Sequence, residues 1–144
     1  MADLLNESQR RMLTSTLMLH EKDLRQADAW LQGIGVEGGI LYHRTLRLSA
    51  EQRVAARQVI AQALEQIAEL ARRFDLRPKE DNLVAAIRAQ MQLDWCDLSE
   101  MYADALKSCG TVDPLLGPSL DPGIAELSRL AMTLAHLFTN EPRK

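Results

Sequence analysis

Residues 49–74, SAEQRVAARQVIAQALEQIAELARRF, have the pattern of one long amphipathic helix. Ser49 followed by Gln52 is a capping box, in which two side chains satisfy the first free N–H groups of a helix. Apolar residues then recur every three or four positions, which places them along one side of the helix. They are Ala56, Ile60, Ala63, Ile67, Leu70 and Phe74. The segment therefore predicts a helix over about 49–74.

The same signals predict three further helices, over about 4–31, 79–108 and 121–139. Asp121 and Pro122 open the last of them, because aspartate caps a helix and proline fits its first turn. The apolar stripes are Leu13, Leu17, His20, Leu24, Ala27 and Leu31 on the first helix; Val84, Ile87, Met91, Trp95, Leu98, Tyr102 and Ala105 on the third; and Leu127, Leu130, Ala131, Leu134 and Phe138 on the fourth. An all-α fold follows.

These helices predict a single domain over residues 1–144, an antiparallel up-down-up-down four-helix bundle. Only about four residues separate the second helix from the third, and so short a connection makes the two antiparallel neighbours. The two longer connections, 32–48 and 110–120, then lie at the same end of the bundle. The second holds four aliphatic residues among glycine and proline, which predicts an ordered cap.

The charge balance limits the classes of partner. The net charge is −3 at pH 7 and the pI is near 5.6, whereas binding to a phosphate backbone normally needs an excess of Lys and Arg on one surface. The sequence has neither a signal-peptide pattern at its start nor an apolar run approaching about 18 residues. We therefore expect a cytoplasmic protein that does not bind a membrane and for which nucleic acid is a disfavoured partner.

Residues 32–48 are unusual for a connection between helices, because four of the seven glycines of the chain lie there beside large apolar residues. The apolar residues are Ile34, Val36, Ile40, Leu41, Tyr42, Leu46 and Leu48. Such a segment is too apolar for a solvated linker, so it packs either on its own bundle or on another molecule. Cationic and aromatic groups gather there and suit an anionic ligand or an acidic peptide. The candidate binding residues are Trp30, Tyr42, His43, Arg44 and Arg47.

Together these features predict a non-enzymatic protein-interaction module, an accessory or adaptor subunit of a cytosolic assembly. The short fourth helix leaves the longer helices partly uncovered, which predicts a homodimer, so the expected partners are a second copy and another protein. No cofactor is expected, although Gly33, Gly35 and Gly38 match a dinucleotide-binding fingerprint, because a helix precedes them where that motif needs a strand. No metal is expected either, because the three histidines lie at different levels of the predicted bundle.

A resemblance in the last helix supports an alternative function. Arg129 and His136 are seven residues apart, a step that returns to nearly the same face of a helix. This spacing resembles the Arg-x(4–6)-His motif of HEPN-type ribonuclease domains, which are small all-α bundles that usually pair to build the site. The resemblance implies RNA cleavage, with Arg129 binding the phosphodiester and His136 performing acid–base chemistry on the 2′-hydroxyl. Leu130 stands where that motif has a polar residue.

His20 is the basis of a third hypothesis. His20-Glu21 resembles the first two letters of a histidine-kinase acceptor box, and the proline of that box is absent. The resemblance implies histidine phosphotransfer through His20. However, His20 lies within the apolar stripe of the first predicted helix, so we expect a core histidine that hydrogen-bonds Asp23 or a neighbouring helix.

Overall fold

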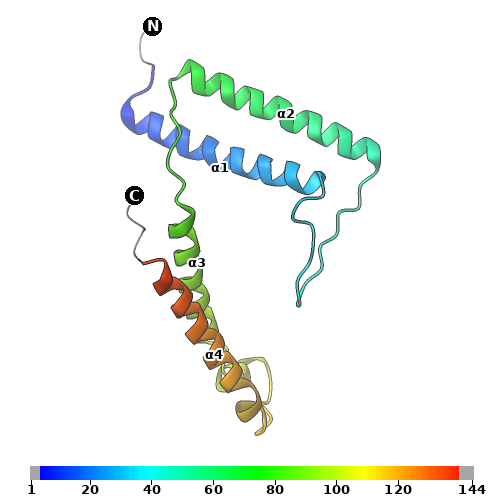
Figure 1. Cartoon of the computed structure of the whole chain (residues 1–144), viewed down its shortest axis with the longest axis vertical. Coiled ribbons are helices and arrows are strands. Elements are labelled where there is room, and N and C mark those ends of the chain that lie inside the picture. The colour runs from blue at the N-terminus through cyan, green and yellow to red at the C-terminus, as the bar shows by residue number, and fades with distance from the viewer. Residues whose placement is uncertain (1–3, 140–144) are drawn as a thin grey trace. The chain divides into compact units, whose positions relative to one another are not determined.

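The computed structural model describes residues 4–139, which form helices and no strand (Figure 1). The elements are α1 (Glu7–Leu31), α2 (Ala50–Arg73), α3 (Leu83–Leu98), the 3-10 helix η1 (Ala103–Cys109) and α4 (Leu116–Leu137). The all-α class is therefore confirmed for the described part of the chain. The chain divides into two compact units, Met1–Lys79 and Glu80–Lys144. The single domain and the bundle topology stay predictions.

In the first unit, α1 and α2 begin in the same way. Asn6 accepts a hydrogen bond from the Gln9 backbone N–H at 2.8 Å, and the Asn6 N–H donates to the Gln9 side chain at 2.9 Å. Ser49 and Gln52 repeat this arrangement with distances of 3.0 and 2.9 Å. The capping box predicted for α2 is present, and α1 has a second one.

Each capping box is followed directly by an arginine that caps the other helix. Arg10 of α1 donates to the Phe74 carbonyl and, at 3.3 Å, to that of Asp75, just beyond the last residue of α2. Arg53 of α2 donates to the carbonyl of Leu31, the last residue of α1. A cation is favourable at a helix C-terminus because the last carbonyls are unpaired and partly negative. The two arginines therefore hold α1 and α2 antiparallel in a fixed register.

The α1–α2 unit buries little of its apolar stripe. Leu31 and Ile60 are buried, whereas the other apolar residues predicted to face the core are half-buried where the structure describes them. Two helices offer each other one contact face only, so a stripe broad enough to contact two neighbours stays partly exposed. One side of this helix pair is accordingly open and apolar.

In the second unit, α3 and α4 pack closely through small side chains. Ser128, Ala131 and Ala135 of α4 are buried, as is Ala103 of η1. The side chain of Asp121 accepts the Ala103 backbone N–H at 2.8 Å and so ties η1 to α4. These contacts replace the broader leucine stripe predicted for the last helix, of which Ala131 is buried and Leu127, Leu130 and Leu134 are exposed.

Three predicted boundaries are wrong. The third helix begins at Leu83, where Asn82 caps it with a hydrogen bond from the Ala85 N–H at 3.1 Å, and it ends at Leu98 before η1. The fourth helix begins at Leu116. Pro122 therefore lies inside α4, and the predicted cap over 110–120 is partly the first turn of that helix. The prediction that Asp121 caps the last helix is wrong, because its side chain accepts the Ala103 N–H and so contacts η1.

The C-terminus of α4 is also capped by an arginine, because Arg88 of α3 donates to the carbonyl of Phe138 at 2.7 Å. Both helix pairs thus use the same contact between the body of one helix and the end of its neighbour. Among the described residues, no helix is both long and apolar enough to cross a membrane.

Candidate functional site

The loop between α1 and α2, residues 32–49, begins with a sharp exit from the helix. The N–H groups of Gly33 and Ile34 donate to the carbonyls of Trp30 and Ala29 at 2.9 and 2.8 Å. Gly33 and Gly35 have φ angles of +82° and +71°, a region that side chains with a Cβ atom rarely adopt. These glycines let the chain leave α1 while Trp30 stays beside the start of the loop.

The far end of the loop is a tight turn with two aliphatic residues at its corner. The Gly39 N–H donates to the Tyr42 carbonyl at 2.9 Å and closes the turn. Ile40 and Leu41 lie between them and are 101% and 95% exposed. Turn corners usually hold Gly, Asn, Asp or Pro, so two fully exposed aliphatic side chains at this position are unusual. We call Ile40 and Leu41 the apolar tip.

Arg44 fixes the returning half of the loop. Its guanidinium carbon lies 5.6 Å from the ring centroid of Trp30 and 5.6 Å from that of Tyr42, within the range of a cation–π contact. Its NH1 group also donates to the Gly35 carbonyl at 3.3 Å. The predicted residues Trp30, Tyr42 and Arg44 are therefore brought together.

Beside this stack lies an open hollow of about 370 Å³. It is lined by Trp30, Val36, Arg44, Thr45 and Leu46. The lining is mainly apolar, with one cation held at its edge, so it suits an apolar group of a partner next to a hydrogen-bond acceptor. We call this pocket the loop hollow.

The structure does not place every predicted residue in the hollow. His43 and Arg47 are exposed on the same segment but do not line it, whereas Val36, Thr45 and Leu46 do. Val36 and Leu46 belong to the large apolar residues of this segment, which is the signal that could have identified them.

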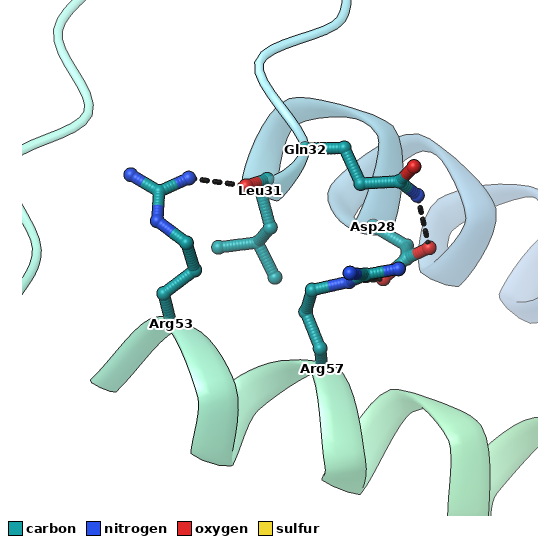
Figure 2. Close-up of polar contacts among 5 residues, drawn as sticks. All are labelled: Asp28, Leu31, Gln32, Arg53 and Arg57. Atoms are coloured by element: carbon teal, nitrogen blue, oxygen red, sulfur yellow. Dashed lines mark hydrogen bonds and ion pairs between the residues drawn. The ribbon is translucent and has the colours of Figure 1, made fainter. Parts of the chain in front are cut away.

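The base of the loop is clamped by polar contacts between α1 and α2 (Figure 2). The Arg57 Nε lies 2.9 Å from the Asp28 carboxylate, which also accepts from the Gln32 side chain at 2.7 Å. The hydrogen bond from Arg57 lowers the pKa of Asp28, and the same bond raises the pKa of Arg57. Figure 2 also shows Arg53 on the Leu31 carbonyl, so the end of α1 is held from two positions.

A second hollow of about 490 Å³ lies at the opposite end of the α1–α2 pair. Its lining combines Arg10, Arg11, Arg77 and Lys79 with Glu7, Thr14 and Asp75. Arg10 caps α2, Arg77 lies 3.7 Å from Asp75, and Lys79 donates to Ser15 at 2.5 Å. Arg10 and Lys79 thus connect α1 to the end of α2 and to the segment that follows it.

Arg129 and His136, the residues of the ribonuclease hypothesis, are both exposed on α4. The Arg129 guanidinium is paired with Glu126 through two contacts of 2.9 and 2.5 Å. The hydrogen bond from Arg129 lowers the pKa of Glu126 and is matched by a raised pKa of Arg129. A substrate phosphate would have to displace this carboxylate.

His20 is exposed on α1, so the prediction of a buried core histidine is wrong. Leu17 and Leu24, the stripe residues before and after it, are half-buried. Cys96 and Cys109 are exposed free thiols. Within residues 4–139, no three His, Cys, Asp or Glu side chains form a group that could hold a metal ion.

The chain matches no protein-family model, no curated protein and no solved structure. Function is therefore inferred from the geometry of the loop between α1 and α2.

Proposed function

We propose that this chain is a non-enzymatic protein-interaction module, an accessory or adaptor subunit of a cytosolic assembly, which docks through residues 32–49. The observation that carries the proposal is the apolar tip, Ile40 and Leu41, fully exposed on a turn that hydrogen bonds and a cation–π stack hold in place. Burying an aliphatic side chain of this size is favourable by about 1.5–3 kcal/mol. A partner that covers the tip gains this free energy at little cost in ordering the loop.

The residues around the tip support the same function. Trp, Tyr and Arg are the residue types that dominate binding energy at protein interfaces. Trp30, Tyr42 and Arg44 meet here, and both aromatic side chains are partly exposed. His43 and Arg47 add polar groups at the rim, where they suit an acidic segment of the partner.

The helices support assembly as well. Leu127, Leu130, Leu134 and Leu137 are spaced three, four and three apart along one side of α4, and all four are exposed. A row of leucines next to a close helix contact is typical of a face that another helix covers. We therefore propose that the open faces of the two helix pairs combine in an up-down-up-down four-helix bundle, and that the protein is a homo-oligomer.

The adaptor function is tested by affinity capture of the tagged full-length chain from the lysate of its source organism, with identification by mass spectrometry. The loop variant carries Ile40→Gln and Leu41→Gln. Met12→Gln with Leu19→Gln is the matched control, because these two apolar residues are exposed on α1 outside the loop. We expect a stoichiometric partner protein with wild type and control, and its loss with the loop variant. Equal recovery in all three would contradict the proposal.

RNA cleavage remains the alternative function, supported by the exposure of Arg129 and His136 on one helix. It predicts that His136→Ala abolishes cleavage of single-stranded RNA and leaves protein capture unchanged. Glu126→Gln should increase cleavage, because it releases Arg129 from its ion pair. Cleavage that persists in His136→Ala, or no cleavage by the wild type, would remove this alternative.

Phosphotransfer through His20 remains the third hypothesis, and the exposure of the imidazole gives a donor access to it. It predicts acid-labile phosphate on the chain that His20→Ala removes. Phosphate that is stable to acid, or that survives this substitution, would rule it out.

A further inference from the structure

The loop between α1 and α2 carries two features that fit each other. One is the projecting apolar tip, Ile40 and Leu41, and the other is the mainly apolar loop hollow beside Trp30 and Leu46. We propose that the tip of one copy of this chain occupies the loop hollow of a second copy, and that the exchange is reciprocal. This inference rests on the proposed function, since it names the occupant of the same surface.

The size of the hollow fits this occupant. An engineered apolar cavity of about 150 Å³ in another protein is large enough to bind benzene. The loop hollow measures about 370 Å³ and is open to the outside, so it has room for the two aliphatic side chains of one tip. Its one cation, Arg44, lies at the edge, where it can donate to a backbone carbonyl of the incoming turn.

The tip does not fill the hollow of its own chain. Ile40 and Leu41 are almost completely exposed, while Val36 and Leu46 line a hollow on the same loop. The stack of Arg44 on Trp30 and Tyr42 holds the returning half of the loop in place, and neither residue of the tip lines the hollow. A second copy of the chain can supply a tip to this hollow.

Because one loop carries both the apolar tip and the hollow, two copies can each place a tip in the hollow of the other, and neither hollow stays empty. Each tip then enters the other hollow around a two-fold axis, which closes the assembly at a dimer. Charge supports this pairing. Glu37 precedes the tip on the outgoing half of the loop, and Arg44 and Arg47 follow it on the returning half. In an antiparallel exchange the Glu37 of one copy faces the basic half of the other.

The expected dimer is weak. Two aliphatic side chains per copy and their surroundings form an interface in the small class, below about 1,200 Å². We therefore expect a dissociation constant in the micromolar range, which sedimentation velocity resolves through a concentration series. Reducing conditions are needed, since Cys96 and Cys109 are both exposed.

A mixing experiment on the full-length chain tests the exchange. The tip variant, Ile40→Gln with Leu41→Gln, lacks the projection but keeps the hollow. The hollow variant, Thr45→Trp, keeps the projection but fills the hollow, and Val36→Trp is a second hollow variant that fills it from the other half of the loop. Circular dichroism checks that each variant is folded. Met12→Gln with Leu19→Gln is the control for loss of exposed apolar surface elsewhere.

We expect the wild type and the control to dimerise. The tip variant and the hollow variants should be monomeric over the same concentrations, with a dissociation constant for self-association at least tenfold higher. A mixture of tip variant and hollow variant should regain a heterodimer, because one tip and one hollow remain intact in that pair. No other use of the loop predicts that two defective chains restore association with each other.

A monomeric wild type would overturn the proposal, and so would a tip variant that still dimerises. The proposal also fails if the tip variant forms a heterodimer with neither Thr45→Trp nor Val36→Trp. These failures are distinct from failure of the proposed function. If the wild type is monomeric but the tip variant loses a captured protein, the adaptor function stands and the exchange is wrong. If the mixture associates but no other protein is captured, the exchange stands and the adaptor function fails.

Discussion

At the scale of single residues, Gly38 is the residue on which the loop geometry depends most. A Cβ atom added there would lie 2.5 Å from the Tyr42 carbonyl oxygen and 2.8 Å from the His43 Cα. Both are backbone atoms that cannot rotate away. At Gly39 the nearest atom, at 2.8 Å, belongs to the Tyr42 ring, which can shift. The two neighbouring glycines thus differ in how much they tolerate a side chain.

We predict that Gly38→Ala opens the turn and increases cleavage by chymotrypsin after Tyr42 several-fold, while Gly39→Ala has a smaller effect. Gly123→Ala in α4 is the control, because nothing lies within 4 Å of its added Cβ. That substitution should raise the free energy of unfolding by about 0.5–1 kcal/mol, as alanine favours a helix over glycine. Equal cleavage of all four proteins would show that the turn is not built as described.

The ion pair of Asp28 and Arg57 gives a pH dependence. The Arg57 hydrogen bond lowers the pKa of Asp28 below its ordinary value of 3.8. A lowered carboxyl pKa adds stability that is fully present above the unfolded value and is lost as the pH falls through the folded value. We therefore predict that Asp28→Asn destabilises the protein at pH 6 and that the difference from wild type shrinks below about pH 4.

Denaturant unfolding at several pH values measures this difference. Arg57→Gln should give the same pH profile, and the double variant should cost no more than either single one, because both remove one interaction. A difference that stays constant down to pH 3 would contradict the assignment.

Single residues also show which parts of the site could be predicted from the sequence and which could not. Trp30, Tyr42 and Arg44 were predicted as a group because apolar, aromatic and cationic residues crowd one connection, and the structure brings them together. His20 was predicted to be buried because its position in the stripe assumes a neighbour on each side. In the structure Leu17 and Leu24, the stripe residues before and after it, are half-buried, while the His20 side chain is exposed.

At the scale of elements, the start of α2 could be predicted from the sequence, whereas the starts of α3 and α4 could not. Capping boxes depend on side chains three residues apart, so Ser49 and Gln52 locate the start of α2 from sequence alone. The role of Asp121 depends on Ala103, eighteen residues away, and therefore on the folded structure. A local rule cannot tell a residue that opens its own helix from one that anchors another.

The arginine caps are the element-scale feature with the clearest consequence. We predict that Arg10→Gln and Arg53→Gln each lower the free energy of unfolding by about 1 kcal/mol, because each removes the guanidinium that donates to a carbonyl at the C-terminus of the neighbouring helix. Arg11→Gln is the matched control next to Arg10, with an exposed side chain on the same helix. Urea unfolding measures all three. A loss for Arg11→Gln as large as that for Arg10→Gln would mean that net charge, and not capping, is responsible.

At the scale of the whole molecule, the two helix pairs share one property. Each buries a few residues along a single contact and leaves a row of apolar side chains beside it. Fully buried cores form when an apolar face is covered by a second layer of structure. The exposed apolar side chains are the observation on which the proposed bundle rests.

The leucine row of α4 tests directly whether the proposed four-helix bundle forms. If the bundle forms, Leu127→Gln and Leu134→Gln place a polar amide in a buried layer, and each should lower the free energy of unfolding by about 2 kcal/mol or more. Leu93→Gln is the control, because Leu93 is exposed on α3 and lies outside the leucine row of α4. A surface substitution of that kind changes stability by about 0.5 kcal/mol or less. Urea unfolding that gives the same small change for all three leucines would mean that the row is solvated, and the bundle would have to be abandoned in favour of two separate helix pairs joined by residues 74–82.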